Sequence, residues 1–225
     1  MNIGIVGGSF DPVHTAHLIL AETFAEQYEL DICFIVPAAV SPFKNKTNAS
    51  DDARLDMLRL AFAGNARFVV DDREIRRGGT SYTIDTLYEY YAEFLDDKIY
   101  LLLGSDAAAG FTNWRQWTKI LSLARVCMAL RPLVKSDGLS IGSDEVFYSD
   151  EQEEGSPVYV AIAKFSSMLS SLGVPDSNLP LPVAAPLIEI SSTDIRQRIA
   201  DARSIRYLVP ESVRNYILDN RLYKK

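Results

Sequence analysis

The feature of this sequence that most constrains its fold is a regular alternation between short apolar runs and longer helical patterns. From the N-terminus the patterns predict strand, helix, strand, helix, strand, helix and strand, over residues 2–7, 15–30, 32–38, 51–64, 66–72, 81–95 and 99–105. This order is typical of an α/β fold, in which helices cover both faces of a parallel sheet. Because such sheets bind ligands at the carboxyl ends of their strands, we expect the motifs that follow the strands to converge on one site.

The second half of the chain interrupts this alternation. Residues 135–182 are rich in Ser, Gly, Pro and acidic side chains, and we expect a loop-rich insertion there, within which 157–172 could form a strand and a short helix. A predicted strand then runs into a helix over 188–202, and a second helix begins at Pro210. We therefore expect a single domain over residues 1–225, with a small C-terminal helical part.

Composition and charge limit the classes of function. The 225 residues, 48% apolar, can bury a substantial core, and no run of about 18 uncharged apolar residues predicts a membrane span. Without a signal peptide, and with Cys33 and Cys127 in apolar runs that lack C-x-x-C spacing, we expect a cytoplasmic protein with core cysteines. The net charge of −7 argues against nucleic-acid binding. The oligomeric state stays open, a homo-oligomer included.

Both histidines of the chain lie three residues apart in the stretch GIVGGSFDPVHTAHL, just after a pair of glycines. Asp11 and Pro12 have the character of an N-cap and a first helical residue, so a helix is expected to begin here, within a few residues. The spacing then places His14 and His17 on one helix face near the positive end of the dipole. Together with a glycine turn that lets the backbone approach a ligand, they predict a phosphate site.

Two other interpretations of the histidine pair compete with a phosphate site. A zinc site is disfavoured, because zinc takes three or four protein ligands and the chain has no further histidine. A purely structural pair is the second alternative, and the glycines and the predicted strand before the pair count against it.

A second candidate motif is ISSTDIRQRI, at residues 190–199. Ser191 and Asp194 have capping-box spacing, which predicts free backbone N–H groups at the start of a helix. Arg196 falls in the second turn, where the helix dipole offers a cation nothing and a bound anion would favour it. Taken alone, an ordinary capped helix explains this segment equally well.

A third candidate follows the predicted strand at 99–105. The stretch LLLGSDA places Gly104 and Asp106 at its end, where a carboxylate can accept hydrogen bonds from ribose hydroxyls. A Gly-x-Asp pattern is weak evidence by itself.

These motifs carry a resemblance to a known family. GGSFDPVHTAH and ISSTDIRQRI resemble the two phosphate motifs of the nucleotidyltransferase superfamily, whose fold is a Rossmann-like doubly wound parallel sheet. VSPFK, SYTIDTL, NWRQW and RYLVPESVRNYI are similar to segments of the bacterial nicotinate mononucleotide adenylyltransferases, and the match covers residues 1–131 and 188–225. The resemblance implies an enzyme of NAD biosynthesis that transfers AMP from ATP to nicotinate mononucleotide, giving deamido-NAD and pyrophosphate.

The resemblance also implies which residues form the site. It makes three residues catalytic: His14, His17 and Arg196. It assigns ATP to Gly7, Gly8, Ser9, Phe10, Gly104, Asp106, Ser191, Ser192 and Thr193. It assigns the mononucleotide to Lys44, Thr83, Ile84, Trp114 and Arg115, with Trp114 on the pyridine ring and backbone N–H groups on the carboxylate. Mg²⁺ would be held mainly by the ATP phosphates, without a protein ligand.

The chain departs from the family pattern at two positions. Arg115 stands where many relatives carry an aromatic residue, so a backbone role is kept there and a packing role is not. Phe43 stands where some relatives have a histidine, which removes any histidine contact from that loop.

The implied mechanism is direct attack of the mononucleotide phosphate on the α-phosphorus of ATP, in line with the departing pyrophosphate. No covalent nucleophile is expected, because neither cysteine is suitably placed and no Ser-His-Asp order appears. The alternatives are a related transferase acting on a pantetheine phosphate, nicotinamide mononucleotide or an alcohol phosphate with CTP, and a non-catalytic nucleotide sensor. A tRNA-charging enzyme is disfavoured by chain length and acidic charge.

Overall fold

The computed structural model describes residues 1–43, 46–129 and 157–224. Lys44, expected to contact the mononucleotide, lies outside the described residues, as does the part of the expected insertion before residue 157. Whether the chain forms one domain with an insertion at 135–182 stays a prediction.

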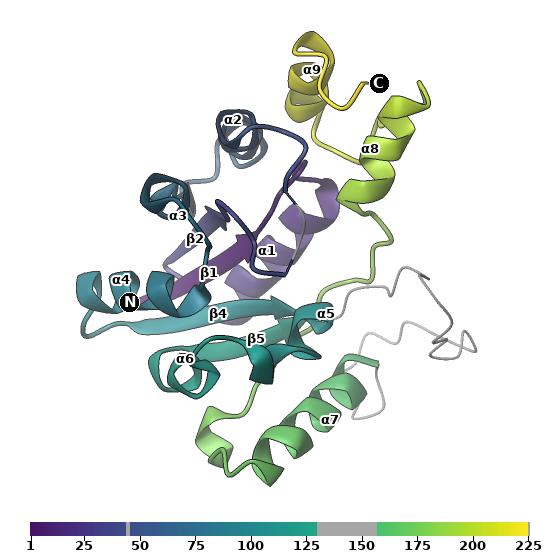
Figure 1. Ribbon diagram of the computed structural model, residues 1–225. Coiled ribbons are helices and arrows are strands. Elements are labelled where there is room, and N and C mark those ends of the chain that lie inside the picture. The colour runs from purple at the N-terminus through teal and green to yellow at the C-terminus, as the bar shows by residue number, and fades with distance from the viewer. Residues whose placement is uncertain (44–45, 130–156, 225) are drawn as a thin grey trace.

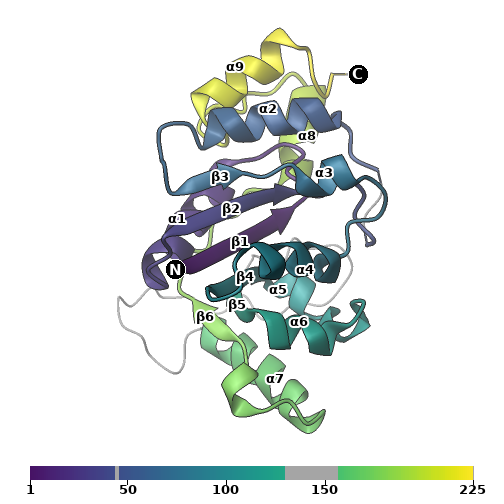
Figure 2. The ribbon, with the colours of Figure 1, turned by 90° about the vertical axis from the view of Figure 1, so that its left-hand side faces the viewer.

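The described strands form one parallel sheet in the order β3-β2-β1-β4-β5-β6 (Figures 1 and 2). They are β1 (Asn2–Gly8), β2 (Ile32–Pro37), β3 (Phe68–Val70), β4 (Lys98–Gly104), β5 (Arg125–Ala129) and β6 (Leu181–Val183). The chain runs outward from β1 to β3 and then returns to the other side of β1, so the strand order reverses between β1 and β4. The expected Rossmann-like doubly wound parallel sheet is confirmed.

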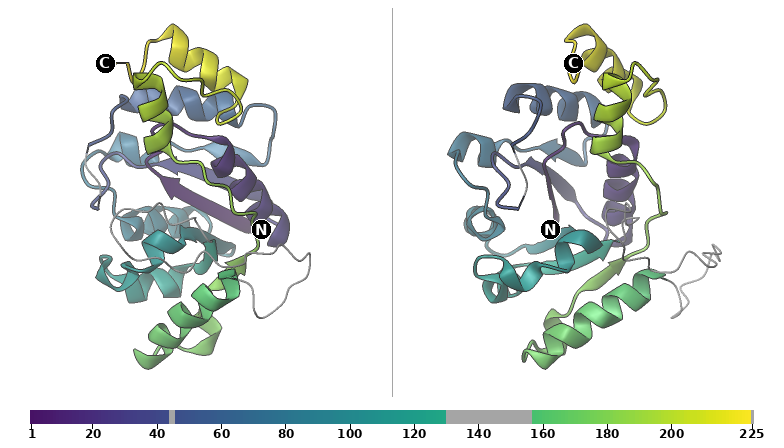
Figure 3. Two further views of the ribbon diagram at one scale, coloured as in Figure 1. Left: turned by 90° about the vertical axis from the view of Figure 1, so that its right-hand side faces the viewer. Right: turned by 45° about the vertical axis from the view of Figure 1, so that its right-hand side comes forward.

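Helices cover both faces of the sheet (Figures 2 and 3). The helix α1 (Thr15–Gln27) lies on one face, and α4 (Thr83–Glu93) and α6 (Trp117–Leu123) lie on the other. The expected C-terminal helices, α8 (Ser192–Ala200) and α9 (Glu211–Asp219), gather with α2 (Asp51–Ala61) at one end of the molecule, while α7 (Pro157–Ser171) lies at the opposite end beside β6. The described short helices are α3 (Arg73–Arg77), α5 (Ser105–Ala108) and the 3-10 turns Phe111–Asn113 and Asp176–Asn178.

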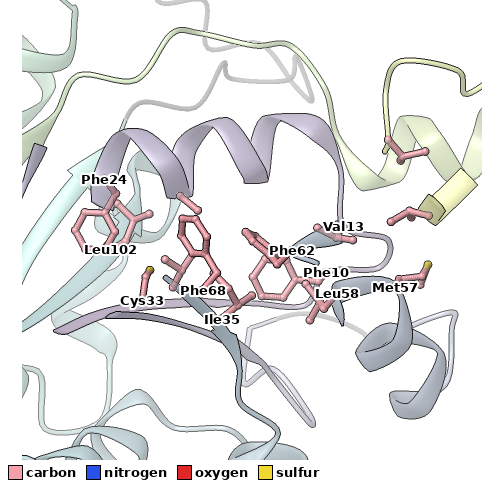
Figure 4. Packing of buried hydrophobic residues seen from close by; sticks show 14 of the residues in the cluster. Phe10, Val13, Phe24, Cys33, Ile35, Met57, Leu58, Phe62, Phe68 and Leu102 are labelled. Atoms are coloured by element: carbon pink, nitrogen blue, oxygen red, sulfur yellow. The ribbon is translucent and has the colours of Figure 1, made fainter. Parts of the chain in front are cut away.

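Two apolar cores, one on each face of the sheet, hold these layers together. The core beneath α1 includes Phe24, Cys33 and Leu102 (Figure 4). Gly4 of β1 leaves room for these side chains, because a Cβ on it would lie 2.4 Å from Cδ1 of Leu30, which would have to move. Both cysteines are buried as free thiols, and burial raises the pKa of the Cys127 thiol to about 12. A neutral buried thiol is not a nucleophile, as the sequence indicated.

The structure corrects three local expectations. The first helix begins at Thr15 with His14 as N-cap, because the Asp11 carboxylate accepts hydrogen bonds from residues 48 and 49 instead of capping the helix. The predicted strand at 188 is absent, because the N–H of Ile190 donates to the carbonyl of Ile188 in a tight turn. Residues 157–171 form one helix and no strand, because their apolar residues recur at helical spacing and bury one face: Ile162, Phe165 and Leu169.

No helix in the described parts of the chain has the length and apolar character to cross a bilayer.

Candidate active site

The candidate site lies where the strand order reverses, at the carboxyl ends of β1 and β4. The two strands pair with Val6 opposite Leu102, and each continues to a terminal glycine, Gly8 in β1 and Gly104 in β4. The segments that follow the two strands therefore start side by side. Asp106 lies exposed on α5, in the segment that follows β4.

The turn after β1 presents bare backbone to solvent. Gly7 is exposed, and a Cβ built on it would meet no atom within 4 Å, so a ligand could approach its main chain closely. Phe10 has a left-handed φ of 46° and only 3% exposure. Its ring points into the core toward Leu58 and Phe62 (Figure 4). Phe10 was expected to contact ATP, and this burial leaves its main chain as the part that can do so.

The two histidines lie together at the start of α1. Their rings stack with centroids 3.7 Å apart, and the edge of Phe10 packs against His17 at 5.0 Å. The backbone N–H of His14 donates to Nδ1 of His17 over 3.2 Å. In the neutral ring the proton of His17 therefore lies on Nε2, the nitrogen that can donate to a phosphate oxygen. Both imidazoles lie at one helix start, as predicted, but His14 is the N-cap with an extended backbone and so is not on the helix face where the spacing placed it.

The start of α8 is capped as its sequence predicts. The Ser191 hydroxyl accepts from the N–H of Asp194 over 3.1 Å. The Ser192 hydroxyl donates to the carbonyl of Pro12 over 2.8 Å, which ties this helix to the loop before the histidines. The N–H groups of Ser192 and Thr193 donate to none of the described residues. They are thus the donors that this helix start offers to an anion.

Arg196 connects the two phosphate motifs. Its Nη1 donates to the main-chain carbonyl of Asp11 over 2.6 Å, across 185 residues of sequence, and its Nη2 donates to the Thr193 hydroxyl over 3.2 Å. A quarter of the side chain is exposed. The fold therefore brings the second motif against the loop that carries the histidines, as a shared phosphate site requires.

Asp11 is a residue whose role the sequence interpretation missed. Its carboxylate is 4% exposed and accepts from the N–H of Asn48 (2.7 Å), the N–H of Ala49 (3.0 Å) and the hydroxyl of Tyr223 (2.8 Å). Burial alone would raise the pKa of Asp11, but these hydrogen bonds outweigh it and the pKa is lowered. A charged carboxylate thus joins the histidine loop to two distant segments.

Arg54 is a second residue that was missed. It is fully buried and donates to the carbonyls of Ser9 (2.8 Å) and Ala38 (2.7 Å) and to the Asp51 carboxylate (2.7 Å). It therefore fixes the loop after β1 against the loop after β2. The signal in the sequence was a cation on the apolar helix face, four residues before Leu58.

The start of α4 forms the other part of the site. The helix begins at Thr83, as expected, and Ile84 is fully buried. Just before it, the N–H of Ser81 donates to the carbonyl of Val40 over 2.8 Å, and the Ser81 hydroxyl accepts from the N–H of Ala39 over 2.9 Å. The loop after β2 is thereby held beside this helix start.

A buried carboxylate supports the same helix start. Glu74 is 8% exposed and accepts from the Thr86 hydroxyl over 2.5 Å. Burial raises the pKa of Glu74, although hydrogen bonds from Thr86 and Ser81 and the charge of Arg77 lower it in part. Nothing in the sequence pattern marked Glu74, because its partners lie on other elements.

Trp114 and Arg115 lie beside α4 through the Arg115 side chain. Its guanidinium lies 5.0 Å above the Tyr82 ring, and its Nη1 is 3.4 Å from the Asp85 carboxylate. The Trp114 ring packs against Phe111 at 5.5 Å and is half-buried. Arg115 thus packs against the start of α4 with its side chain.

Phe43 lies against the face expected to receive the pyridine ring. Its ring is 61% exposed and stacks on Trp114 with centroids 5.9 Å apart. The position that carries a histidine in some relatives therefore supplies an aromatic surface here.

Among the described residues, no three His, Cys, Asp or Glu side chains come together as a metal site would require.

Comparison with known proteins identifies relatives of the whole chain. Residues 5–198 match the model of the family described as cytidylyltransferase-like. A Marinobacter nauticus protein named "Probable nicotinate-nucleotide adenylyltransferase" is 38% identical over 93% of this chain and 90% of its own length. A Geobacter protein of the same name is 37% identical over 99% of this chain and 98% of its own length.

A solved structure shares the fold. The nicotinic acid mononucleotide adenylyltransferase of Plasmodium falciparum, complexed with NaAD, aligns with a TM-score of 0.70 over 99% of this chain and 97% of its own. At 19% identity this likeness concerns the fold alone.

Proposed function

The chain belongs to the nicotinate-nucleotide adenylyltransferases of the cytidylyltransferase-like family. We propose that its candidate site transfers AMP from ATP to nicotinate mononucleotide. The products are deamido-NAD and pyrophosphate. The observation that carries the proposal is the meeting of the two phosphate motifs, with Arg196 bound to the main chain of Asp11 three residues before the stacked histidines.

The reaction is one displacement at phosphorus. A phosphate oxygen of the mononucleotide forms a bond to the α-phosphorus of ATP while the bond to the bridging oxygen breaks, and pyrophosphate leaves with that electron pair. The attacking oxygen is already ionised, so no general base is required. Catalysis is therefore alignment of the two substrates and stabilisation of charge on the α-phosphate oxygens.

The histidines are suited to stabilise that charge. His17 carries its proton on Nε2, because Nδ1 accepts from the backbone N–H of His14. The two rings stand at the positive end of the α1 dipole, where negative charge is favoured. We assign both imidazoles to the α-phosphate as hydrogen-bond donors.

Arg196 and the start of α8 are suited to the departing pyrophosphate. The N–H groups of Ser192 and Thr193 and the partly exposed guanidinium form a cluster of donors around one helix N-terminus. Mg²⁺ bound to the phosphates would neutralise part of their charge.

The start of α4 and the segment around Trp114 are suited to the nicotinate ring and its carboxylate. The N–H groups of Ile84 and Arg115 donate to none of the described residues. Two such N–H groups can donate to the two oxygens of a carboxylate. The NH₂ of a carboxamide is itself a donor and cannot accept from either of them. We therefore assign the preference for the acid over the amide to these two N–H groups, and ring stacking to Trp114.

Pyrophosphate release with ATP and Mg²⁺ tests the proposal, with nicotinate mononucleotide, its amide analogue and phosphopantetheine as acceptors. Release with nicotinate mononucleotide, and less with the amide, is the expected result. Release with phosphopantetheine in place of the nucleotides would contradict the assignment of the acceptor. If none of the acceptors gives pyrophosphate release, although the protein still binds ATP, a nucleotide sensor would be indicated.

A further inference from the structure

The Asp11 carboxylate is saturated by neutral donors. Oδ2 accepts from the backbone N–H of Asn48 (2.7 Å) and from its side-chain amide (3.1 Å). Oδ1 accepts from the N–H of Ala49 (3.0 Å) and from the hydroxyl of Tyr223 (2.8 Å). The charge of Asp11 is thus stabilised without any close hydrogen bond to a cation.

Among the described residues, the cation that lies within 4 Å of this carboxylate is Arg196, and its hydrogen bond goes to the main chain of Asp11 and not to the carboxylate. Nη1 of Arg196 lies 2.6 Å from the main-chain carbonyl of Asp11 but 3.8 Å from the carboxylate oxygen Oδ2. The guanidinium is therefore positioned by a neutral acceptor. Since a carboxylate and a phosphate compete for the same donors, this geometry leaves Arg196 available to an anionic ligand.

Tyr223 supplies the donor that comes from farthest along the chain. It follows α9, and its partly buried ring packs against the core on the α1 side. Burial, together with the negative charge of Asp11, raises the pKa of the Tyr223 hydroxyl, so it stays protonated and donates at neutral pH. Its role is not visible in the sequence motifs, because 212 residues separate it from Asp11.

We propose that Tyr223 is a positioning residue, which acts through Asp11 to keep Arg196 available to pyrophosphate. Without the hydroxyl, Oδ1 of the buried carboxylate loses a donor and the negative charge of the whole carboxylate is less well compensated. The guanidinium of Arg196, 3.8 Å from the other oxygen Oδ2, is then drawn toward the carboxylate. Arg196 then binds the phosphates less well. The inference rests on the proposed role of Arg196 and extends it to a residue that touches no substrate.

The test compares Tyr223→Phe with Tyr216→Phe. Tyr216 is a matched control, because its hydroxyl also donates to a carboxylate over 2.9 Å, but to that of Asp56 on α2 and not to Asp11. Affinity for pyrophosphate is measured by calorimetry, and the KM values of ATP and nicotinate mononucleotide by steady-state kinetics. We expect Tyr223→Phe to lower the affinity for pyrophosphate about tenfold and to raise the KM of ATP about tenfold. The KM of nicotinate mononucleotide should be unchanged. Tyr216→Phe should leave all three constants unchanged.

A second background separates positioning from loss of structure. In an Asp11→Asn variant the carboxylate charge that competes for Arg196 is absent. Adding Tyr223→Phe to this variant should therefore lower the affinity for pyrophosphate no further. Equal losses in both backgrounds, or a Tyr223→Phe variant that melts earlier but binds pyrophosphate normally, would overturn the inference.

Arg196→Ala distinguishes the two levels of the argument. If Arg196→Ala lowers the affinity for pyrophosphate and Tyr223→Phe does not, the positioning inference alone fails. If Arg196→Ala leaves pyrophosphate binding unchanged, the proposed role of Arg196 fails, and the positioning inference fails with it.

Discussion

The two parts of the candidate site are built in opposite ways. We call the residues around the histidines, Asp11 and Arg196 the phosphate half, and those around Phe43, Trp114 and Arg115 the pyridine half. The phosphate half is held by short hydrogen bonds from segments far apart in sequence: Asn48 and Tyr223 donate to the buried Asp11 carboxylate, and Arg196 donates to the main-chain carbonyl of Asp11. In the pyridine half, Phe43 is 61% exposed and the guanidinium of Arg115 reaches its carboxylate partner only at 3.4 Å.

This difference matches the two tasks of the proposed reaction. Stabilising charge at phosphorus requires donors fixed before the substrate arrives, because reorganisation during the reaction would raise the barrier. Selecting an acceptor requires a surface that fits one ring and excludes others. The partly exposed aromatic pair Phe43 and Trp114 can offer such a surface to the pyridine ring of the acceptor. Disturbing the phosphate half should therefore change kcat most, and disturbing the pyridine half should change the KM of the acceptor.

The largest effect is expected from His17→Ala. Loss of one donor to the transition state should lower kcat about 100- to 1000-fold, with a small change in the KM of nicotinate mononucleotide. Thr23→Ala is the control, since Thr23 lies on the same helix and its hydroxyl bonds only within α1. A His17→Ala variant with normal kcat, measured by pyrophosphate release, would remove the histidine from the chemistry.

Arg54→Met should mainly lower stability. It leaves the carbonyls of Ser9 and Ala38 without their buried donor, and we expect a loss of about 2 to 4 kcal/mol in the free energy of unfolding. Arg59→Met is the control, because Arg59 pairs with Asp56 at the same spacing but in solvent and should change stability by less than about 1 kcal/mol. Urea unfolding of the two variants measures the difference, and equal losses would contradict the bridging role of Arg54.

Trp114→Ala addresses the pyridine half. Loss of a stacking surface should raise the KM of nicotinate mononucleotide about tenfold and leave the KM of ATP unchanged. Trp117→Ala is the control, since Trp117 packs on the same Phe111 ring but lies in α6. Should Trp114→Ala raise the KM of ATP equally, the division between the two halves would be wrong.

The smallest effect concerns Glu74 and has a sign that depends on pH. Its pKa is raised in the folded protein, so its contribution to stability is complete below the unfolded value and is lost as pH rises through the folded pKa. Glu74→Gln should remove this dependence. The free energy of unfolding of the variant, relative to that of the native protein, should therefore rise from acid to neutral pH. Glu211→Gln, at an exposed carboxylate on α9, is the control, and parallel stability curves for native protein and Glu74→Gln would contradict the expectation.

The sequence predicted the local features of the site better than its connections. The alternation of patterns predicted the parallel sheet, and short motifs placed His14, His17, Ser191 and the start of α4, because caps and spacing act within a few residues. The contacts of Asp11 could not be predicted, since they depend on how the fold brings distant segments together. For the same reason the edge position beside β5 is filled by Leu181–Val183, and the apolar run at 188 pairs with no described strand.

The central claim is that AMP passes directly between two substrates bound together, and exchange of labelled pyrophosphate into ATP tests it most directly. In the absence of nicotinate mononucleotide and deamido-NAD, we expect no exchange, because direct transfer forms no adenylyl-enzyme from which pyrophosphate could regenerate ATP. Adding deamido-NAD should restore label in ATP by the reverse reaction. Exchange with ATP, Mg²⁺ and pyrophosphate alone would show an adenylyl-enzyme, and would contradict direct transfer.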